Sequence, residues 1–310
     1  MKKVLFLQSN KDQTQTFVRY LRKYKPDYEL YFDKTSKYDK NMEFDIIIPC
    51  GAASTLIYFM DKGELKIGKS SFAEENFITY DKINMLKLVK EIGVPIPRTF
   101  TNRKDLDFFP VFFKSLREEV YRERGIIKNK EELKKIKSKT VFFQEFIDSQ
   151  GTYSVGFLAE QGKIITSFAQ KEVISVPYHG GSAVVLERLE DPKLSEYTAR
   201  IAKKVNYSGW GLAEYKYCNV RKDYVFMEVN AKFWASIEFA FINNPIFLKE
   251  LFDIDIKAKD VKTAVYIDRW LASNVREMIK VLPYMVKAKW MKNQKLLQAI
   301  KKRFKKDPTQ

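Results

Sequence analysis

The first eighty residues alternate short apolar runs with a segment of helical periodicity. Apolar runs of strand length occur at residues 2–9, 28–33 and 44–52, and residues 13–24 carry apolar side chains at helical spacing. Apolar strands that alternate with helical segments are typical of a parallel sheet, because parallel neighbours need crossover connections. We therefore predict a small parallel α/β lobe over residues 1–80, with the loops after its strand ends open to ligands.

The pattern changes after residue 80. Asp81 precedes a helical segment and can cap it, Gly93 can end that helix, and Pro95 and Pro97 favour an extended exit. We expect a new part of the fold to begin with this helix.

Residues 81–260 predict an α+β region rich in antiparallel hairpins. Strand-like runs are expected at 108–115, 140–147, 152–176 and 209–230, helices at 129–138 and 192–205, and a polar loop at 116–125.

The segment FMEVNAKF, at residues 226–233, places two polar side chains inside an apolar run. Side chains two residues apart in a strand share a face, so Glu228 and Asn230 lie side by side. Carboxylate and amide oxygens are the hard ligands that Mg²⁺ prefers. The alternative is an ordinary half-exposed strand. The residues of the neighbouring strand must decide between this alternative and a metal site.

A hairpin centred on Arg221 supplies that neighbour. It places Glu214 opposite Glu228 and Lys216 opposite Phe226, and directly opposed side chains share a face. Two opposed carboxylates repel unless a cation lies between them. This register therefore predicts a divalent-metal site, whereas a register slip of one residue would separate the ligands.

Lys114 ends the apolar strand PVFFK, where its ammonium group could meet a phosphate. The alternative is a solvated lysine at a strand end. Residues 122–133 follow, with a single glycine before a helix, and such a loop could cover phosphates with backbone N–H groups.

These segments, taken in order, resemble the ATP-grasp superfamily, which includes carboxylate–amine ligases and the large subunit of carbamoyl-phosphate synthetase. The resemblance covers about residues 81–239. The matching segments are DKINMLKLVKEIGVPIPRTF, PVFFKS, GIIKNKEELKK, FFQEFIDSQGTYSVGF, HGGSAV and GWGLAEYKYCNVRKDYVFMEVNAKFWASI. The resemblance implies an ATP-grasp fold in which two α+β subdomains, over residues 81–260, clasp ATP.

The resemblance also implies residue roles. It assigns ATP phosphates to Lys82 and Lys114, the adenine hinge to Gln144, Glu145, Phe146 and Ile147, magnesium (or manganese) to Glu214, Glu228 and Asn230, catalytic charge to Lys216 and Lys232, and a substrate loop to His179, Gly180, Gly181 and Ser182. In this family ATP phosphorylates a carboxylate, and an amine or similar nucleophile then displaces phosphate. Small carboxylates and amines are therefore the expected partners.

Three departures from the family pattern leave alternatives open. Lys232 stands where the family has arginine, Thr152 stands where an acidic residue usually binds ribose, and the phosphate loop carries arginines in place of glycines. A fold retained for nucleotide binding, with weak or no ligase activity, is one alternative, and a basic nucleic-acid-binding protein is another. His179, the only histidine, suits acid–base work near neutral pH, but a lone histidine in a loop is more often a polar surface residue.

Composition fits a folded protein of a reducing compartment. The chain has 310 residues, of which 45% are apolar, and its two cysteines, Cys50 and Cys218, lie in strand-like runs. The apolar run at residues 4–7 is too short for a signal peptide, and no run approaches the roughly eighteen residues of a membrane span. We expect a cytoplasmic protein.

Positive charge gathers at the C-terminus. The formal net charge is +17, and residues 269–310 carry twelve cations against two acids. We predict a basic helical tail over residues 261–310, with lysines alternating with Trp290 and aliphatic residues. Such a helix suits an anionic membrane at its inner face, or it packs on the body with a solvated cationic side. No nucleic acid is expected, because the tail carries no recognised binding motif.

Overall fold

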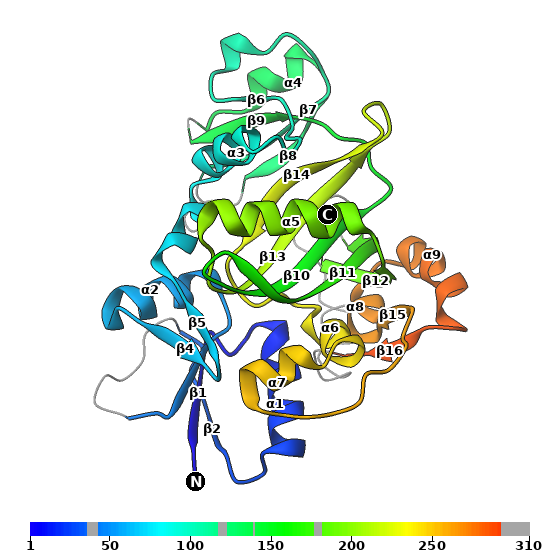
Figure 1. Ribbon diagram of the computed structural model, residues 1–310. Helices are drawn as coiled ribbons and strands as arrows, with labels where there is room; N and C mark the ends of the chain where they lie inside the picture. The colour runs from blue at the N-terminus through cyan, green and yellow to red at the C-terminus, as the bar shows by residue number, and fades with distance from the viewer. Residues whose placement is uncertain (36–42, 117–122, 139, 177–181, 293–310) are drawn as a thin grey trace.

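The structure is a computed structural model that describes residues 1–35, 43–116, 123–138, 140–176 and 182–292 (Figure 1). It contains a small N-terminal lobe, a large central sheet and a smaller sheet that faces the central one. The described helices include none with both the length and the apolar character that crossing a bilayer would require.

The N-terminal lobe is the predicted parallel α/β unit. Its three-stranded sheet has the order β2-β1-β3, with both pairs parallel. The elements are β1 (Lys3–Leu7), α1 (Asp12–Tyr24), β2 (Glu29–Phe32), β3 (Ile46–Pro49), α2 (Ala52–Lys62), β4 (Leu65–Ile67), β5 (Ser70–Phe72) and the 3₁₀ helix η1 (Glu74–Tyr80). Buried Phe6 and Phe17 pack between sheet and helix, which explains the apolar spacing of both segments.

The central sheet has seven strands in the order β14-β13-β10-β11-β12-β15-β16. Its strands are β10 (Thr152–Glu160), β11 (Lys163–Val176), β12 (Ser182–Leu189), β13 (Gly209–Cys218), β14 (Asp223–Asn230), β15 (Thr263–Tyr266) and β16 (Lys289–Met291). All neighbours are antiparallel except β15 and β16. Helix α5 (Pro192–Val205) packs across one face of this sheet, as Figure 1 shows.

The smaller sheet has the order β6-β9-β7-β8. Its elements are α3 (Lys82–Glu91), β6 (Thr99–Phe100), η2 (Arg103–Asp105), β7 (Val111–Ser115), β8 (Arg124–Ile127), α4 (Lys130–Lys135) and β9 (Val141–Glu145). Asp81 caps α3 by accepting the N–H of Asn84 at 3.0 Å, as its sequence position predicted. The expected polar loop is wrong at its end, because Arg124 and Gly125 belong to β8 and pair with β7.

Helices α6 (Ile237–Asn243) and α7 (Ile246–Phe252) join the N-terminal lobe to the body. Phe17 of α1 contacts Phe233, Phe241 and Phe252, with ring centroids 4.8, 5.9 and 5.7 Å away. These aromatic contacts place the start of α1 beside the end of β14 (Figure 1).

The expected basic helical tail over residues 261–310 differs from the structure in part. Helices α8 (Ile267–Ala272) and α9 (Val275–Met285) are present, but β15 and β16 extend the central sheet on either side of them. Trp290 lies in β16 and not on a helix. The spacing of apolar residues near Trp290 fits either a helix or a short strand. The strand forms because it pairs with β15, which lies earlier in the chain and cannot be inferred from the local pattern.

Candidate active site

The β13–β14 hairpin brings Glu214 and Glu228 directly opposite each other, as the sequence predicted. Between this pair and the turn, a β-bulge shifts the register, so that Tyr215 pairs with Phe226. Lys216 therefore lies opposite Val225, and its predicted pairing with Phe226 is wrong. Lys216 keeps the face of Glu214 because the two residues are two positions apart on one strand.

The bulge places two side chains of β14 that are two positions apart, Phe226 and Glu228, on opposite faces of the sheet. Phe226 is fully buried and packs edge-on against Tyr215, with centroids 5.8 Å apart. Glu228, two residues later, instead faces the smaller sheet, where Lys114 reaches it. Without the extra residue, strand alternation would put both side chains on one face. The bulge therefore allows an apolar core and a charged site to share one strand.

Three side chains of this face fit a divalent cation. The Nδ2 atom of Asn230 lies 3.2 Å from Oε1 of Glu214 and 3.3 Å from Oε1 of Glu228. Turning the amide over presents its oxygen to the same point, which gives three hard oxygen donors. Among the described residues, no three His, Cys, Asp or Glu side chains cluster as metal ligands, so the amide is needed.

The two carboxyl groups differ in ionisation. Burial, together with Glu228 and Glu172, raises the pKa of Glu214 to about 8, although Lys232 and Lys216 oppose that shift. Burial also disfavours the charge on Glu228, but Lys114, Lys82 and Lys232 outweigh burial and lower its pKa to about 2. Without metal, Glu228 is ionised at neutral pH and Glu214 is mostly protonated. A divalent cation would favour ionisation of both.

Both lysines expected at ATP phosphates lie at this point. The Nζ atoms of Lys114 and Lys82 are 3.3 and 3.8 Å from Oε2 of Glu228. Lys114 comes from β7 of the smaller sheet and Lys82 from the first position of α3. Both ammonium groups are largely buried, so a polyanion between them and the central sheet would meet concentrated positive charge.

The segment Gln144–Ile147 runs from the end of β9 toward the central sheet. The N–H of Glu145 donates to Arg98 and that of Phe146 to Pro110, so an adenine would contact other backbone groups here. The Glu145 carboxylate pairs with Arg221 at the tip of the β13–β14 hairpin. Glu145 thus connects the two sheets through its side chain, while Gln144 is buried and donates to Thr99 at 3.4 Å.

An apolar surface adjoins this segment. Ile147, Cys218 and Val225 are buried together, and Met227 of the bulge packs against them. Their position beside the lysines and carboxylates suits the flat face of a purine base. Sequence reasoning placed Ile147 in the adenine hinge but gave Cys218, Val225 and Met227 no role, because an apolar residue next to Glu228 is indistinguishable from core.

Lys216 is held at the other side of Glu214. Its ammonium group donates to Thr152 Oγ1 at 2.8 Å and to the Gly151 carbonyl at 3.1 Å. Burial lowers the pKa of Lys216 from its ordinary value, although Glu214 and Glu172 oppose the shift. Lys216 therefore contributes charge to the face while its direction is fixed by the start of β10.

Glu172 is a site residue that the sequence analysis missed. It lies directly opposite Thr152 in the β10–β11 pair, so its side chain shares the face of Lys216. Its carboxylate accepts from Ser175 at 3.2 Å, and burial raises its pKa. Thr152 stands where the family pattern has an acidic residue, and the Glu172 carboxylate lies beside it on the neighbouring strand. The turn at Gln161 and Gly162 sets the register only as far as Ala159, because a bulge between Leu158 and Ala159 shifts it, so the sequence did not signal the pairing of Glu172 with Thr152.

Lys232 follows β14 and influences both carboxylates, lowering the pKa of Glu214 and of Glu228. The preceding Ala231 is buried, and its carbonyl accepts from the Tyr80 hydroxyl at 3.2 Å. The expected positive charge after Asn230 is therefore present at the edge of the site.

The N-terminal lobe closes this edge. Gln13 of α1 donates to the carbonyls of Cys50 and Phe233, joining two loops of the lobe to the segment after β14. Buried Arg269 of α8 donates to Asp12 at 3.1 Å and to the Ala183 carbonyl at 2.6 Å. The sequence gave no sign of the contacts from Gln13 to Phe233 and from Arg269 to Asp12 and Ala183, because they join segments more than eighty residues apart.

The predicted substrate loop is described only at its end. His179, Gly180 and Gly181 lie outside the described residues, so their roles stay predictions. Ser182 begins β12, is exposed and pairs with Val176.

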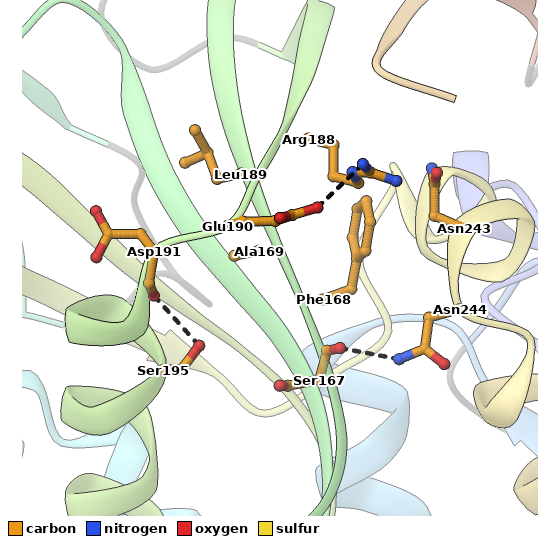
Figure 2. Close-up of a pocket in the computed structure, with 10 residues that line it drawn as sticks. All are labelled: Ser167, Phe168, Ala169, Arg188, Leu189, Glu190, Asp191, Ser195, Asn243 and Asn244. Carbon is orange, nitrogen blue, oxygen red and sulfur yellow. Dashed lines mark hydrogen bonds and ion pairs between the residues drawn. The ribbon is translucent and has the colours of Figure 1, made fainter. Parts of the chain in front are cut away.

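A separate cavity of about 350 Å³ lies away from these groups (Figure 2). Its lining includes Arg188 of β12, Glu190 and Asp191 of the β12–α5 connection, and Asn243 and Asn244 at the end of α6. Figure 2 shows Arg188 paired with Glu190 inside it. None of the predicted site residues lines this cavity, so it is distinct from the cluster around Glu228.

Solved structures share this architecture at low sequence identity. Biotin carboxylase from Campylobacter jejuni aligns with a TM-score of 0.58 and 14% identity over 83% of this chain and 72% of its own. D-alanine–D-alanine ligase from Bacillus anthracis aligns with a TM-score of 0.56 and 14% identity over 82% and 96%. A putative ATP-grasp superfamily protein from Archaeoglobus fulgidus gives 0.57 and 15% over 83% and 90%.

Other comparisons set the limits of this likeness. Pyruvate carboxylase from Rhizobium etli aligns at a TM-score of 0.58 and 13% identity, and this chain spans 27% of it. No family model matches the sequence. No curated protein matches it either. The sheets, the facing lysines and the carboxylate pair on β13 and β14, together with these structural matches, show that the chain has the ATP-grasp fold.

Proposed function

We propose that this protein is an ATP-dependent ligase that activates a carboxylate as an acyl phosphate and joins it to an amine or similar nucleophile. One observation carries the proposal: Lys82 and Lys114, from two different elements, converge on Glu228, which shares Asn230 with Glu214. This arrangement of buried cations and oxygen ligands fits a magnesium triphosphate.

ATP would lie between the two sheets. Its purine would rest on Ile147, Cys218, Val225 and Met227, and its phosphates would separate Lys82 and Lys114 from Glu228. A magnesium ion held by Glu214, Glu228 and Asn230 would neutralise charge on the phosphate oxygens during transfer.

The chemistry requires no covalent bond to the protein. A carboxylate oxygen of the acid attacks the γ-phosphorus, and the bond to the β,γ-bridging oxygen breaks to release ADP. The amine nitrogen then attacks the acyl carbon, phosphate leaves with the electrons of the C–O bond, and the nitrogen loses a proton to water. Lys82, Lys114 and Lys232 would stabilise the negative charge that moves in both steps.

The acid and the amine would bind where Lys232 meets the N-terminal lobe. Asp12, Gln13 and Arg269 hold the start of α1 beside the segment after β14. This edge faces away from the apolar purine surface, so it leaves the γ-phosphate between nucleotide and acid.

An oxygen-transfer experiment tests the proposal. Purified protein is incubated with ATP, Mg²⁺ and mixtures of small carboxylates and amines, with mass spectrometry for products. The active acid is then labelled with ¹⁸O in its carboxylate. An acyl phosphate intermediate moves one ¹⁸O atom into the released phosphate, whereas simple ATP hydrolysis does not.

A matched pair of variants controls this experiment. Glu228→Gln should remove the transfer, and Glu160→Gln, at the exposed end of β10, should keep it. ATP binding without carboxylate-dependent phosphate release would instead support the alternative of a fold retained for nucleotide binding.

A further inference from the structure

Helix α9 has an exposed apolar stripe that the fold does not use. Val275, Ile279, Leu282 and Val286 are 61%, 59%, 50% and 88% exposed, and their spacing places them on one side of the helix. The opposite side packs through fully buried Val281 against the sheet cluster of Val184, Val185 and Val265. The packed-helix expectation is therefore met on one side only.

Trp290 extends the stripe beyond the helix. Its side chain is 56% exposed, and its indole N–H donates to the carbonyl of Met285 at 3.0 Å. This bond fixes an amphipathic aromatic ring next to the last turn of α9. Such rings favour the boundary between water and lipid headgroups.

Cations surround the stripe. Arg276 and Lys280 each follow a stripe residue by one position, which puts them about 100° around the helix on the same flank. Glu277 is the only acid among residues 275–292 and lies about 200° from Val275, on the far side. Lys287, Lys289 and Lys292 continue the charge past the helix.

We propose that the stripe (Val275, Ile279, Leu282, Val286 and Trp290) with its basic flank binds an anionic lipid surface. Apolar side chains enter the headgroup boundary, while the lysines and arginine stay at the phosphate level. Helix α9 lies at the outer edge of the molecule in Figure 1, on the side away from the N-terminal lobe.

The positive charge around the stripe favours an anionic bilayer over a second copy of the chain or residues 293–310. A second copy of the chain would bring its own five cations against these five, which disfavours self-association. Residues 293–310 carry six further cations and one acid, so this segment would add positive charge to the stripe and not neutralise it. An anionic bilayer neutralises both segments, and its attraction is worth about fivefold in affinity per cation near the surface.

Vesicle co-sedimentation of the full chain tests the inference. At low salt, the protein should sediment with phosphatidylcholine vesicles that contain phosphatidylglycerol and remain in solution with phosphatidylcholine alone. Raising salt to about 0.5 M should release most of it, because the Debye length falls below about 5 Å. Trp290 emission should shift to the blue on binding, and Trp290→Phe should remove the shift.

Two double variants distinguish binding through the stripe from non-specific adsorption of exposed apolar side chains to vesicles. Ile279→Ser with Leu282→Ser should lower binding to anionic vesicles at least tenfold. Ile57→Ser with Met60→Ser changes an exposed pair with the same spacing on α2 and should leave binding unchanged. Thermal unfolding midpoints of both variants show whether the fold is intact.

Three results would overturn the inference. They are no sedimentation with anionic vesicles at low salt, equal binding by the Ile279/Leu282 variant, and a dimer in sedimentation equilibrium that this variant abolishes. The last result would make the stripe a contact between copies. Because the ¹⁸O experiment uses no lipid, it stands or falls independently.

Discussion

The two faces of the β13–β14 hairpin are built from the same two strands, with the bulge at Met227 between them, and have opposite chemistry. One face carries Glu214 and Glu228 beside Lys114, and the other carries Tyr215 and Phe226 beneath α5. The second face carries uncharged aromatic side chains. Its polar group, the Tyr215 hydroxyl, lies 2.9 Å from the Thr198 hydroxyl of α5.

This contrast shows how the fold supports a costly cluster of charges. Bringing two carboxyl groups together and burying two ammonium groups is unfavourable until a ligand arrives. The rigid aromatic face keeps the strands in place during that time, because close-packed interiors deform little. Changes on the first face should therefore affect chemistry, and changes on the second should affect folding.

The largest effect is expected on the aromatic face. Phe226→Ala removes a fully buried ring and should lower the free energy of unfolding by about 3–5 kcal/mol, through lost burial and a residual cavity. Urea denaturation monitored by circular dichroism measures this change. Turnover per folded molecule should fall far less than in the carboxylate variants. Full stability with lost turnover would show that Phe226 faces the site.

The carboxylate variants come next. Glu228→Gln and Glu214→Gln should each lower turnover by about 10²–10³-fold, or roughly 2.7–4 kcal/mol, because each removes one negative ligand from the cation site. Steady-state phosphate release under saturating ATP measures the change. Wild-type turnover in either variant would exclude its role as a metal ligand.

The same two variants should move stability in opposite directions without metal. The raised pKa of Glu214 costs stability as pH rises from 4.5 toward 8, so glutamine should relieve that cost at pH 7. The lowered pKa of Glu228 contributes stability above pH 4.5 that is lost as pH falls toward 2, so glutamine should remove it. Thermal unfolding at pH 7 with a chelator distinguishes them.

Lysine substitutions should have an intermediate effect. Lys82→Ala and Lys114→Ala should each weaken ATP binding or phosphoryl transfer by about 1.5–3 kcal/mol, the value of a charge-assisted contact. Titration calorimetry and turnover measure the two effects. Lys87→Ala, on the exposed side of α3, is the control and should match the wild type. Unchanged affinity and turnover in both variants would remove these lysines from the site.

The smallest effect is expected at the edge of the charged face. Lys232→Ala should lower turnover by roughly tenfold, about 1.4 kcal/mol, while ATP affinity changes little, because we propose that Lys232 acts on the acid and not on the nucleotide. Lys222→Ala, in the hairpin turn, is the matched control. A fully active Lys232→Ala protein would show that no cation is needed there.

Strand alternation explains why much of this site could be predicted. Glu214, Glu228 and Asn230 follow the period of two, and the turn residues set their register. The bulge at Met227 could not be predicted, because its position depends on Phe226 packing against Tyr215. The bulge lies between the predicted metal ligands and the turn, so the predicted register of Glu214 and Glu228 was correct and the pairing of Lys216 was not.

Long-range contacts mark the limit of sequence reasoning. Lys114 was recognisable from its strand end, but Gln13 and Arg269 contact partners in other parts of the chain that no local pattern encodes. The same holds for Trp290, whose strand forms only on the edge of β15. The role of residues 177–181 as a substrate loop stays a prediction, since these residues lie outside the described part of the chain.

The contact between Arg269 and Asp12 spans 257 residues of chain and has a consequence for synthesis. As the chain leaves the ribosome, Arg269 emerges long after its partner Asp12 of α1. Long separations make such contacts late in folding. We expect nascent chains arrested before Arg269 to be cleaved by protease beside Asp12 more readily than full-length chains, whereas Phe17 already holds the middle of α1 in both. The edge that we propose binds the acid would then be completed only after Arg269 is made.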